Sequence, residues 1–154
     1  MQTHSDDGAE RERRFRSLYA ATYPDLLRFV SRRVHPSHAE DVVADTFLVA
    51  WRRLDAIPAE TGDARAWLFG TTRKVLLNDR RGLRRRAALA VRIGDAAATA
   101  VTDLEPEQLA DRLDLAAAWR RLTDTEQETF ALAVWDDLTG PQAASVLGIS
   151  PVAY

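Results

Sequence analysis

The sequence contains no cysteine among its 154 residues and only three histidines. The lack of cysteine excludes a disulfide framework and a thiolate zinc site. No hydrophobic run reaches the length of about 18 residues that a membrane-spanning helix needs. The N-terminal residues are polar, so we expect neither a signal peptide nor membrane insertion, and we predict a disordered tail over residues 1–9. These features together favour a cytoplasmic protein.

Enzyme signatures are missing as well. The sequence has no P-loop, no glycine-rich phosphate cradle, no nucleophile elbow and no HExxH motif. His35, His38 and Asp41 have a spacing that could suggest a metal site. Pro36 and Ser37 favour a surface turn at that position instead. We therefore expect a protein that is not an enzyme and that holds no metal and no cofactor.

Charge is unevenly distributed along the chain, although the net charge is only −2. Residues 63–92 contain nine arginines and lysines against two acids, a net charge of +7. Residues 93–154 contain three arginines against eleven acids, a net charge of −8. Lys74 is the only lysine, and arginine suits bidentate contacts with phosphate and guanine. The segregation of charge predicts a nucleic-acid contact on the middle segment.

Apolar residues recur mostly at helical spacing, and strand signals are weak, so the predicted fold class is all-α. We expect two small helical domains, a helical bundle over residues 10–86 and a helix-turn-helix domain over residues 106–154. A flexible linker rich in alanine, threonine and aspartate should join them over residues 87–105. Within the bundle, the first helix should begin near Glu10, and Pro24 should interrupt or kink it.

The second predicted helix opens with a capping box, Ser37 to Glu40, and runs to about Asp55. Its core face carries apolar residues at helical spacing: Val43, Phe47, Ala50 and Leu54. Its opposite face carries Asp41, Asp45, Leu48 and Trp51. A face that mixes acids with leucine and tryptophan is typical of a docking surface. The alternative, that Leu48 and Trp51 complete a wide core stripe, is not decided by periodicity.

A loop at residues 56–62 precedes the third predicted helix, which Asp63 should cap and which should run to about Arg86. The predicted buried stripe of this helix is Ala64, Trp67, Leu68, Thr71 and Val75. Another face carries basic residues: Arg73, Arg80 and Arg84, with Lys74, Arg81 and Arg85 beside them. The alternative for the arginine run is a solvated helix end that complements the helix dipole.

The second predicted domain begins near Pro106, a residue suited to the first turn of a helix. Capping boxes at Thr123–Glu126 and Thr139–Gln142 each open a further helix. The pattern therefore predicts three helices before the end of the sequence.

The last residues, 139–154, have the layout of a helix-turn-helix. Gly148 can take the left-handed turn, while Ser150 caps a second helix and Pro151 occupies its first position. The first residues of such a second helix normally contact base edges in the major groove. We expect the sequence to stop at Tyr154 after one turn of this helix, as a natural end or as a truncation. A plain helical hairpin is the alternative.

Several stretches resemble one family. They are FRSLYAATYPDLLRFVSRRV, HAEDVVADTFLVAWRRL and DARAWLFGTTRKVLLNDRR, followed later by RLTDTEQETFALAVWDDLTGPQAASVLGIS. Over about residues 15–86 and 109–154 the chain is similar to the extracytoplasmic-function (ECF, group 4) sigma factors of the sigma-70 family. The most specific piece is AEDVVADTF-x-x-AW joined by a short loop to ARAWLF. The resemblance implies a sigma region 2 bundle and an incomplete sigma region 4 in a protein that directs RNA polymerase to promoters.

The resemblance also implies roles for individual residues. The second helix would bind the clamp helices of the largest polymerase subunit, through Asp41, Asp45, Leu48 and Trp51. The 56–62 loop would capture a base flipped from the melted −10 strand, and the basic helix would hold the −10 region. The implied −10 contacts are Ile57, Pro58, Thr61, Arg73, Lys74, Asn78, Arg81, Arg84 and Arg85. The second domain would sit at the polymerase flap, and the implied −35 contacts are Ser150, Pro151 and Tyr154.

The chain departs from the family pattern at three positions. Ala44 stands where glutamine is usual, and Lys74 and Asn78 stand where asparagine and aspartate are common. The last two put base preference in doubt, because side chains on that helix set it. An anti-sigma factor wrapped around both domains is a further implied partner.

Two other functions remain open. A sigma-like decoy would titrate an anti-sigma factor without reading promoters, which fits the incomplete recognition helix and the acidic second domain, although the basic helix argues against it. A one-component repressor would use the helix-turn-helix but would leave residues 15–86 unexplained.

Overall fold

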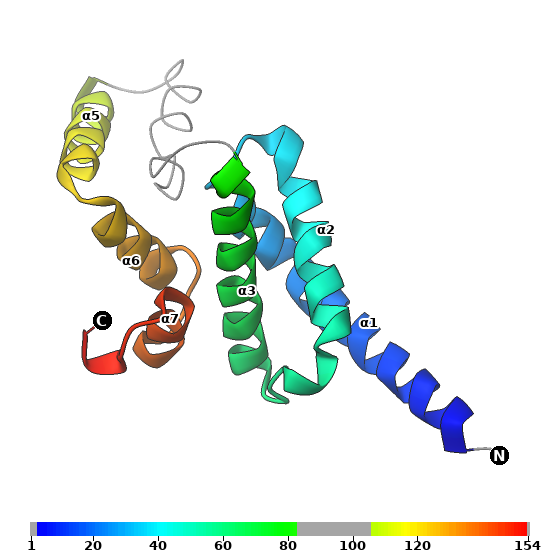
Figure 1. Ribbon diagram of the computed structural model, residues 1–154. Coiled ribbons are helices and arrows are strands. Elements are labelled where there is room, and N and C mark those ends of the chain that lie inside the picture. The colour runs from blue at the N-terminus through cyan, green and yellow to red at the C-terminus, as the bar shows by residue number, and fades with distance from the viewer. Residues whose placement is uncertain (1–2, 83–105, 154) are drawn as a thin grey trace.

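The computed structural model describes residues 3–82 and 106–153 (Figure 1). Every regular element within these two ranges is a helix, which confirms the predicted all-α class. The α-helices are α1 (Thr3–Ser31), α2 (Pro36–Arg52), α3 (Thr61–Gly82), α5 (Pro106–Arg121), α6 (Asp124–Val134) and α7 (Gly140–Leu147). Two 3-10 turns, η1 (Leu54–Ala56) and η4 (Pro151–Ala153), complete the list. None of the helices in these ranges is long and apolar enough to cross a membrane.

Helix α1 is longer and more continuous than the sequence predicted. It begins at Thr3, inside the segment expected to be a disordered tail, where ion pairs such as Glu12–Arg16 support a polar helix. Pro24 lies within α1 and does not end it. Ala20 and Pro24 are both exposed, so water can reach the Ala20 carbonyl, which lacks an N–H partner at Pro24.

Helix α2 begins one residue before the expected cap. His35 is the N-cap, and its Nδ1 accepts the Ser37 N–H at 3.3 Å. The predicted capping box from Ser37 to Glu40 is therefore wrong, because Pro36 occupies the first helical position, which suits its fixed φ. The predicted core face is confirmed: Val43, Phe47, Ala50 and Leu54 are all buried.

Helix α3 begins at Thr61, and the Glu60 side chain rather than that of Asp63 accepts a hydrogen bond from its first turn. The Asp63 N–H donates to Glu60 Oε2 at 2.8 Å. Hydrogen bonds from the backbone of Gly62 and Asp63 lower the pKa of the Glu60 carboxyl. Of the predicted stripe, Ala64 and Leu68 are buried, whereas Trp67, Thr71 and Val75 are half-buried. The stripe omitted Ala66, Phe69, Thr72 and Leu76, which are also buried because α3 is covered on two sides.

The capping boxes at the starts of α6 and α7 are confirmed. The Thr123 N–H donates to Glu126 at 2.7 Å, and the Thr139 N–H donates to Gln142 at 3.1 Å. Helix α7 ends at Gly148, whose φ of 72° is the left-handed conformation that the pattern predicted. The chain then enters η4, so the expected second helix begins as a 3-10 turn.

One hydrophobic core runs through both described ranges. Its centre includes Leu26 and Phe29 of α1, Ala50 of α2 and Leu68 of α3, all fully buried. Val146 of α7 belongs to the same cluster. Figure 1 shows α6 and α7 on the side of α3 away from α1 and α2, so α3 is packed between two groups of helices. The predicted linker, residues 87–105, lies outside the described residues, and the domain boundaries remain predictions.

Candidate functional site

The exposed face of α2 has the composition that the sequence indicated. Asp41 and Asp45 are exposed, and the side chains of Leu48 and Trp51 keep 54% and 39% of their surface in solvent. The alternative in which Leu48 and Trp51 complete the buried stripe is therefore wrong. Both residues line an open cavity of about 540 Å³ between α1 and α2. An acidic face with exposed leucine and tryptophan is available for a partner.

Aromatic side chains from α1 form the other wall of this cavity. The rings of Phe15 and Trp51 meet edge to face with centroids 5.1 Å apart, and those of Tyr19 and Phe47 lie 4.5 Å apart. The Arg11 guanidinium lies 5.3 Å from the Trp51 ring centroid and pairs with Asp55 at 3.0 Å. These contacts fix the orientation of Trp51 while leaving part of it exposed. Sequence reasoning missed the wall that α1 provides, because α1 and α2 meet only in the fold.

The loop between η1 and α3 forms one side of a second cavity, of about 270 Å³. Ile57 is buried and Pro58 and Thr61 are exposed, and all three line this cavity. The opposite wall belongs to α1, and Arg14 Nη2 donates to the Ile57 carbonyl at 2.7 Å. The volume is near the lower end of small-molecule sites, roughly 300 Å³, and so suits one flat ring better than a large ligand.

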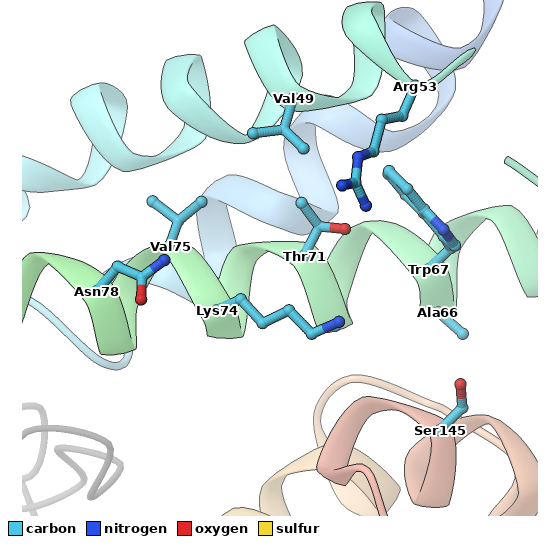
Figure 2. Close-up of a pocket in the computed structure, with 10 residues that line it drawn as sticks. Val49, Arg53, Ala66, Trp67, Thr71, Lys74, Val75, Asn78 and Ser145 are labelled. Atoms are coloured by element: carbon cyan, nitrogen blue, oxygen red, sulfur yellow. The ribbon is translucent and has the colours of Figure 1, made fainter. Parts of the chain in front are cut away.

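Helix α3 carries Arg73, Lys74 and Arg81 of the predicted basic residues, and their surroundings differ. Lys74 and Asn78 are exposed and line a cavity of about 260 Å³ whose walls also include Arg53, the C-cap residue of α2, and Ser145 of α7. Figure 2 shows Ser145 pointing toward the side of α3 that carries Lys74. Arg81 lies in the last turn of α3 with only its backbone described. Arg84 and Arg85 lie outside the described residues.

Arg73 differs from Lys74 because it has an acidic partner. Arg73 Nε donates to Glu128 Oε1 at 2.8 Å, and Arg73 Nη2 donates to Glu128 Oε2 at 3.2 Å. The Glu128 side chain is only 4% exposed and that of Arg73 is 23% exposed. The predicted DNA contact at Arg73 is therefore occupied in this structure by a carboxylate of α6.

A second ionic contact joins the end of α1 to the turn after α6. Asp136 accepts from Arg32 Nη1 at 2.9 Å and from Arg33 Nη2 at 3.4 Å. Arg33 also donates to the Phe29 carbonyl and lies over the Phe29 ring at 3.6 Å. Burial raises the pKa of the Asp136 carboxyl and lowers that of the Arg33 guanidinium, although their mutual attraction acts the other way. Sequence reasoning missed this pair.

The remaining predicted residues lie apart from these surfaces. Ser150 and Pro151 are exposed next to η4, and Tyr154 lies outside the described residues. His35 Nδ1 lies 2.8 Å from Ser37 Oγ at the start of α2. In the described ranges, no group of three or more histidine, aspartate or glutamate side chains is placed to hold a metal ion.

Comparison with known proteins identifies the family. Residues 18–86 match the Sigma-70 region 2 family. The chain is 29% identical over 136 residues to the ECF RNA polymerase sigma factor SigL of Mycobacterium tuberculosis, a match that covers 88% of this chain and 77% of SigL. It is 35% identical over 124 residues to the RNA polymerase sigma factor CnrH of Cupriavidus metallidurans, covering 72% and 62% of the two chains. It is 32% identical over 129 residues to the RNA polymerase sigma factor NccH of Alcaligenes xylosoxydans xylosoxydans, covering 78% and 67%.

The match to SigL covers 88% of this chain and therefore includes residues of both described ranges. The chain therefore belongs to the sigma-70 family, as an RNA polymerase sigma factor of the extracytoplasmic-function class.

Proposed function

We propose that this sigma factor docks on core RNA polymerase through the exposed face of α2 and recognises and opens the −10 region through α3 and the loop before it. The protein would act in the cytoplasm, where it would meet polymerase and promoter DNA. The observation that carries the proposal is the separation of two different surfaces on one bundle. An acidic and apolar face lies on α2, and a small cavity lies at the start of the basic helix α3.

The cavity beside the 57–61 loop fits the capture of a single unstacked base. Extrusion of a base costs a few kcal/mol, so a pocket and a basic helix must act together to hold the melted strand. Ile57, Pro58 and Thr61 line the pocket, while Lys74 and Asn78 are exposed further along α3. Arg14 of α1, which holds the Ile57 carbonyl, becomes a positioning residue of the same site. Ser150 and Pro151 are proposed −35 contacts.

Run-off transcription with purified core polymerase and fragmented genomic DNA tests the proposal directly. We expect discrete promoter-dependent transcripts that disappear without this chain. The double variant Asp41→Lys/Asp45→Lys should weaken binding to core polymerase, whereas Arg73→Ala/Arg81→Ala should reduce open-complex formation more than core binding. The reverse order of effects would contradict the assignment of the two surfaces.

A second candidate function is the sigma-like decoy, which the pairing of Arg73 with Glu128 favours, since a predicted DNA contact is engaged within the chain. Such a protein would bind an anti-sigma factor and produce no promoter-specific transcript. A chain that binds an anti-sigma factor, yet gives no run-off product on any genomic fragment, would establish the decoy in place of the sigma factor.

A further inference from the structure

The cavity of about 260 Å³ beside α3 is built from three helices that are far apart in the sequence. Arg53 at the end of α2 forms one wall, Thr71 and Lys74 of α3 form the floor, and Ser145 of α7 forms the opposite side (Figure 2). The proposed function uses Lys74 as a DNA contact but gives the cavity itself no role.

Two cations of this cavity have no acidic partner among the described residues. Neither the Arg53 nor the Lys74 side chain makes a hydrogen bond or an ion pair with any residue that the structure describes. Arg73, next to Lys74 in the sequence, is by contrast paired with Glu128 at 2.8 Å. Figure 2 shows the guanidinium of Arg53 and the ammonium of Lys74 both directed toward Thr71. Two like charges that converge on one cavity attract an anion into it.

Hydroxyl and amide groups beside the two cations supply neutral hydrogen-bond donors. The Thr71 and Ser145 hydroxyls and the Asn78 amide all line the cavity. The Thr72 hydroxyl, one position further along α3, donates to the Leu68 carbonyl at 2.8 Å, whereas that of Thr71 bonds to no described residue. Charged and hydroxyl donors together match the oxygens of a phosphate group, which accept hydrogen bonds. The donor set therefore favours a phosphate over a carboxylate, which has fewer oxygens to offer.

The rest of the cavity wall is apolar and includes one aromatic ring. Val49 of α2 and Val75 of α3 line it, and the indole of Trp67 lies at the end of the cavity next to Arg53 (Figure 2). Trp67 is half-buried, so part of its ring stays available to a flat group. The volume is near the lower end of small-molecule sites, roughly 300 Å³, and leaves room for a phosphate and one ring system but not for a duplex. A small aromatic phosphate fits these features.

We propose that this cavity is a binding site for a free nucleoside monophosphate, whose phosphate lies between Arg53 and Lys74 and whose base packs on Trp67. The site goes beyond promoter recognition, since it takes a small molecule and depends on Arg53, which is not among the proposed DNA contacts. Because the walls come from α2, α3 and α7, the nucleotide binds only the folded chain and stabilises it by mass action.

Calorimetric titration of the full chain with AMP, GMP, CMP and UMP tests the site. We expect at least one of these nucleotides to bind. The same nucleoside without its phosphate, and inorganic phosphate alone, should each bind at least about tenfold more weakly, because each makes only part of the contacts. Saturating nucleotide should also raise the melting temperature. Absence of binding by all of these nucleotides would overturn the proposal.

Arg53→Ala and Arg52→Ala form a matched pair of variants. Each removes one positive charge at the end of α2, and both arginines are exposed, but of the two only Arg53 lines the cavity. We expect Arg53→Ala to weaken nucleotide binding at least about tenfold, whereas Arg52→Ala should change it by less than about twofold. Equal losses would mean that the nucleotide responds only to the overall charge, and would overturn the site.

Two further variants test the cavity without altering its charge. Ser145→Leu extends a larger side chain from α7 into the space and should weaken nucleotide binding at least about tenfold. Thr71→Val nearly keeps the volume of the side chain and removes its hydroxyl, so we expect a loss of about fivefold. The melting temperature of each variant without nucleotide shows that it is folded. Unchanged nucleotide affinity in both variants would place the nucleotide elsewhere and overturn the proposal.

The phosphates of a DNA strand have the same chemistry as the phosphate of a free nucleotide. Titration of a fluorescent single-stranded oligonucleotide distinguishes the two sources, and we expect Arg53→Ala to lose less than about twofold in affinity for it. A loss as large as that for the nucleotide would assign the cavity to the DNA strand and overturn the proposal. Run-off transcription by the native chain is a separate measurement, so its absence would contradict the proposed function and leave the nucleotide site standing.

Discussion

The α2 face provides a prediction whose magnitude follows from the structure. Leu48 keeps 54% of its surface exposed, so a partner that covers it would bury about half of a leucine side chain. Full burial of leucine contributes about 1.5–3 kcal/mol, which makes the half about 1 kcal/mol. We therefore expect Leu48→Ala to weaken core polymerase binding about fivefold. Trp51→Ala, which removes a residue type enriched among binding hot spots, should cost about 2 kcal/mol, or about 30-fold.

The same two substitutions should affect the stability of the fold less than they affect binding. Leu48 is mostly exposed, so Leu48→Ala should change the free energy of unfolding by about 0.5 kcal/mol or less. Trp51 touches the Phe15 ring and the Arg11 guanidinium. Loss of both contacts should destabilise the fold by about 1–2 kcal/mol. That loss corresponds to a fall in melting temperature of about 2–8 °C for a chain of this length.

The assay is a titration of fluorescently labelled sigma factor with core polymerase, with unfolding followed separately by circular dichroism. Leu77→Ala is the matched control, because Leu77 is a leucine of α3 that is 36% exposed outside the α2 face. The docking assignment is refuted if Leu48→Ala and Trp51→Ala lose no more affinity for core polymerase than Leu77→Ala does.

Three predictions concern the fold. Phe29 is fully buried, with its ring stacked 4.7 Å from that of Phe69, so Phe29→Ala should cost about 3–5 kcal/mol in a urea titration. Phe130→Ala on the exposed side of α6 should cost far less, and similar losses for the two variants would contradict the assigned core. Gly148→Ala should destabilise the fold by about 1 kcal/mol, because the φ of 72° strains a residue with a side chain although the space around it is open. Gly8→Ala should instead stabilise the fold by about 0.5–1 kcal/mol, because glycine is unfavourable inside a helix such as α1. If both glycine variants change the melting temperature in the same direction, these two predictions are wrong. Hydrogen bonds from Thr123 lower the folded pKa of Glu126 below its ordinary value of 4.5. The advantage of the native chain over Glu126→Gln should therefore be complete above that value and vanish as the pH falls through the folded pKa. A difference in unfolding free energy that does not change with pH would contradict the capping role.

Local features of the fold were predictable because their signals lie within one or two helical turns. The core stripe of α2 follows from apolar residues at helical spacing, and the caps at Thr123 and Thr139 follow from residues three positions apart. Gly148 follows from the need for a left-handed residue after α7. The cap expected at Ser37 and the interruption expected at Pro24 were wrong, and both errors are also local. At Pro24, water can reach the Ala20 carbonyl, so the proline does not break the helix. At the start of α2, the preference of Pro36 for the first helical position moved the cap from Ser37 to His35.

The contacts that close the structure could not be predicted, since no local pattern records them. Arg73 and Glu128 are 55 positions apart, and Arg33 and Asp136 are 103 apart. The charge totals of the two segments indicated attraction, but totals do not specify which arginine meets which acid. The sequence therefore predicted a free basic helix, whereas the structure has its central arginine engaged by α6.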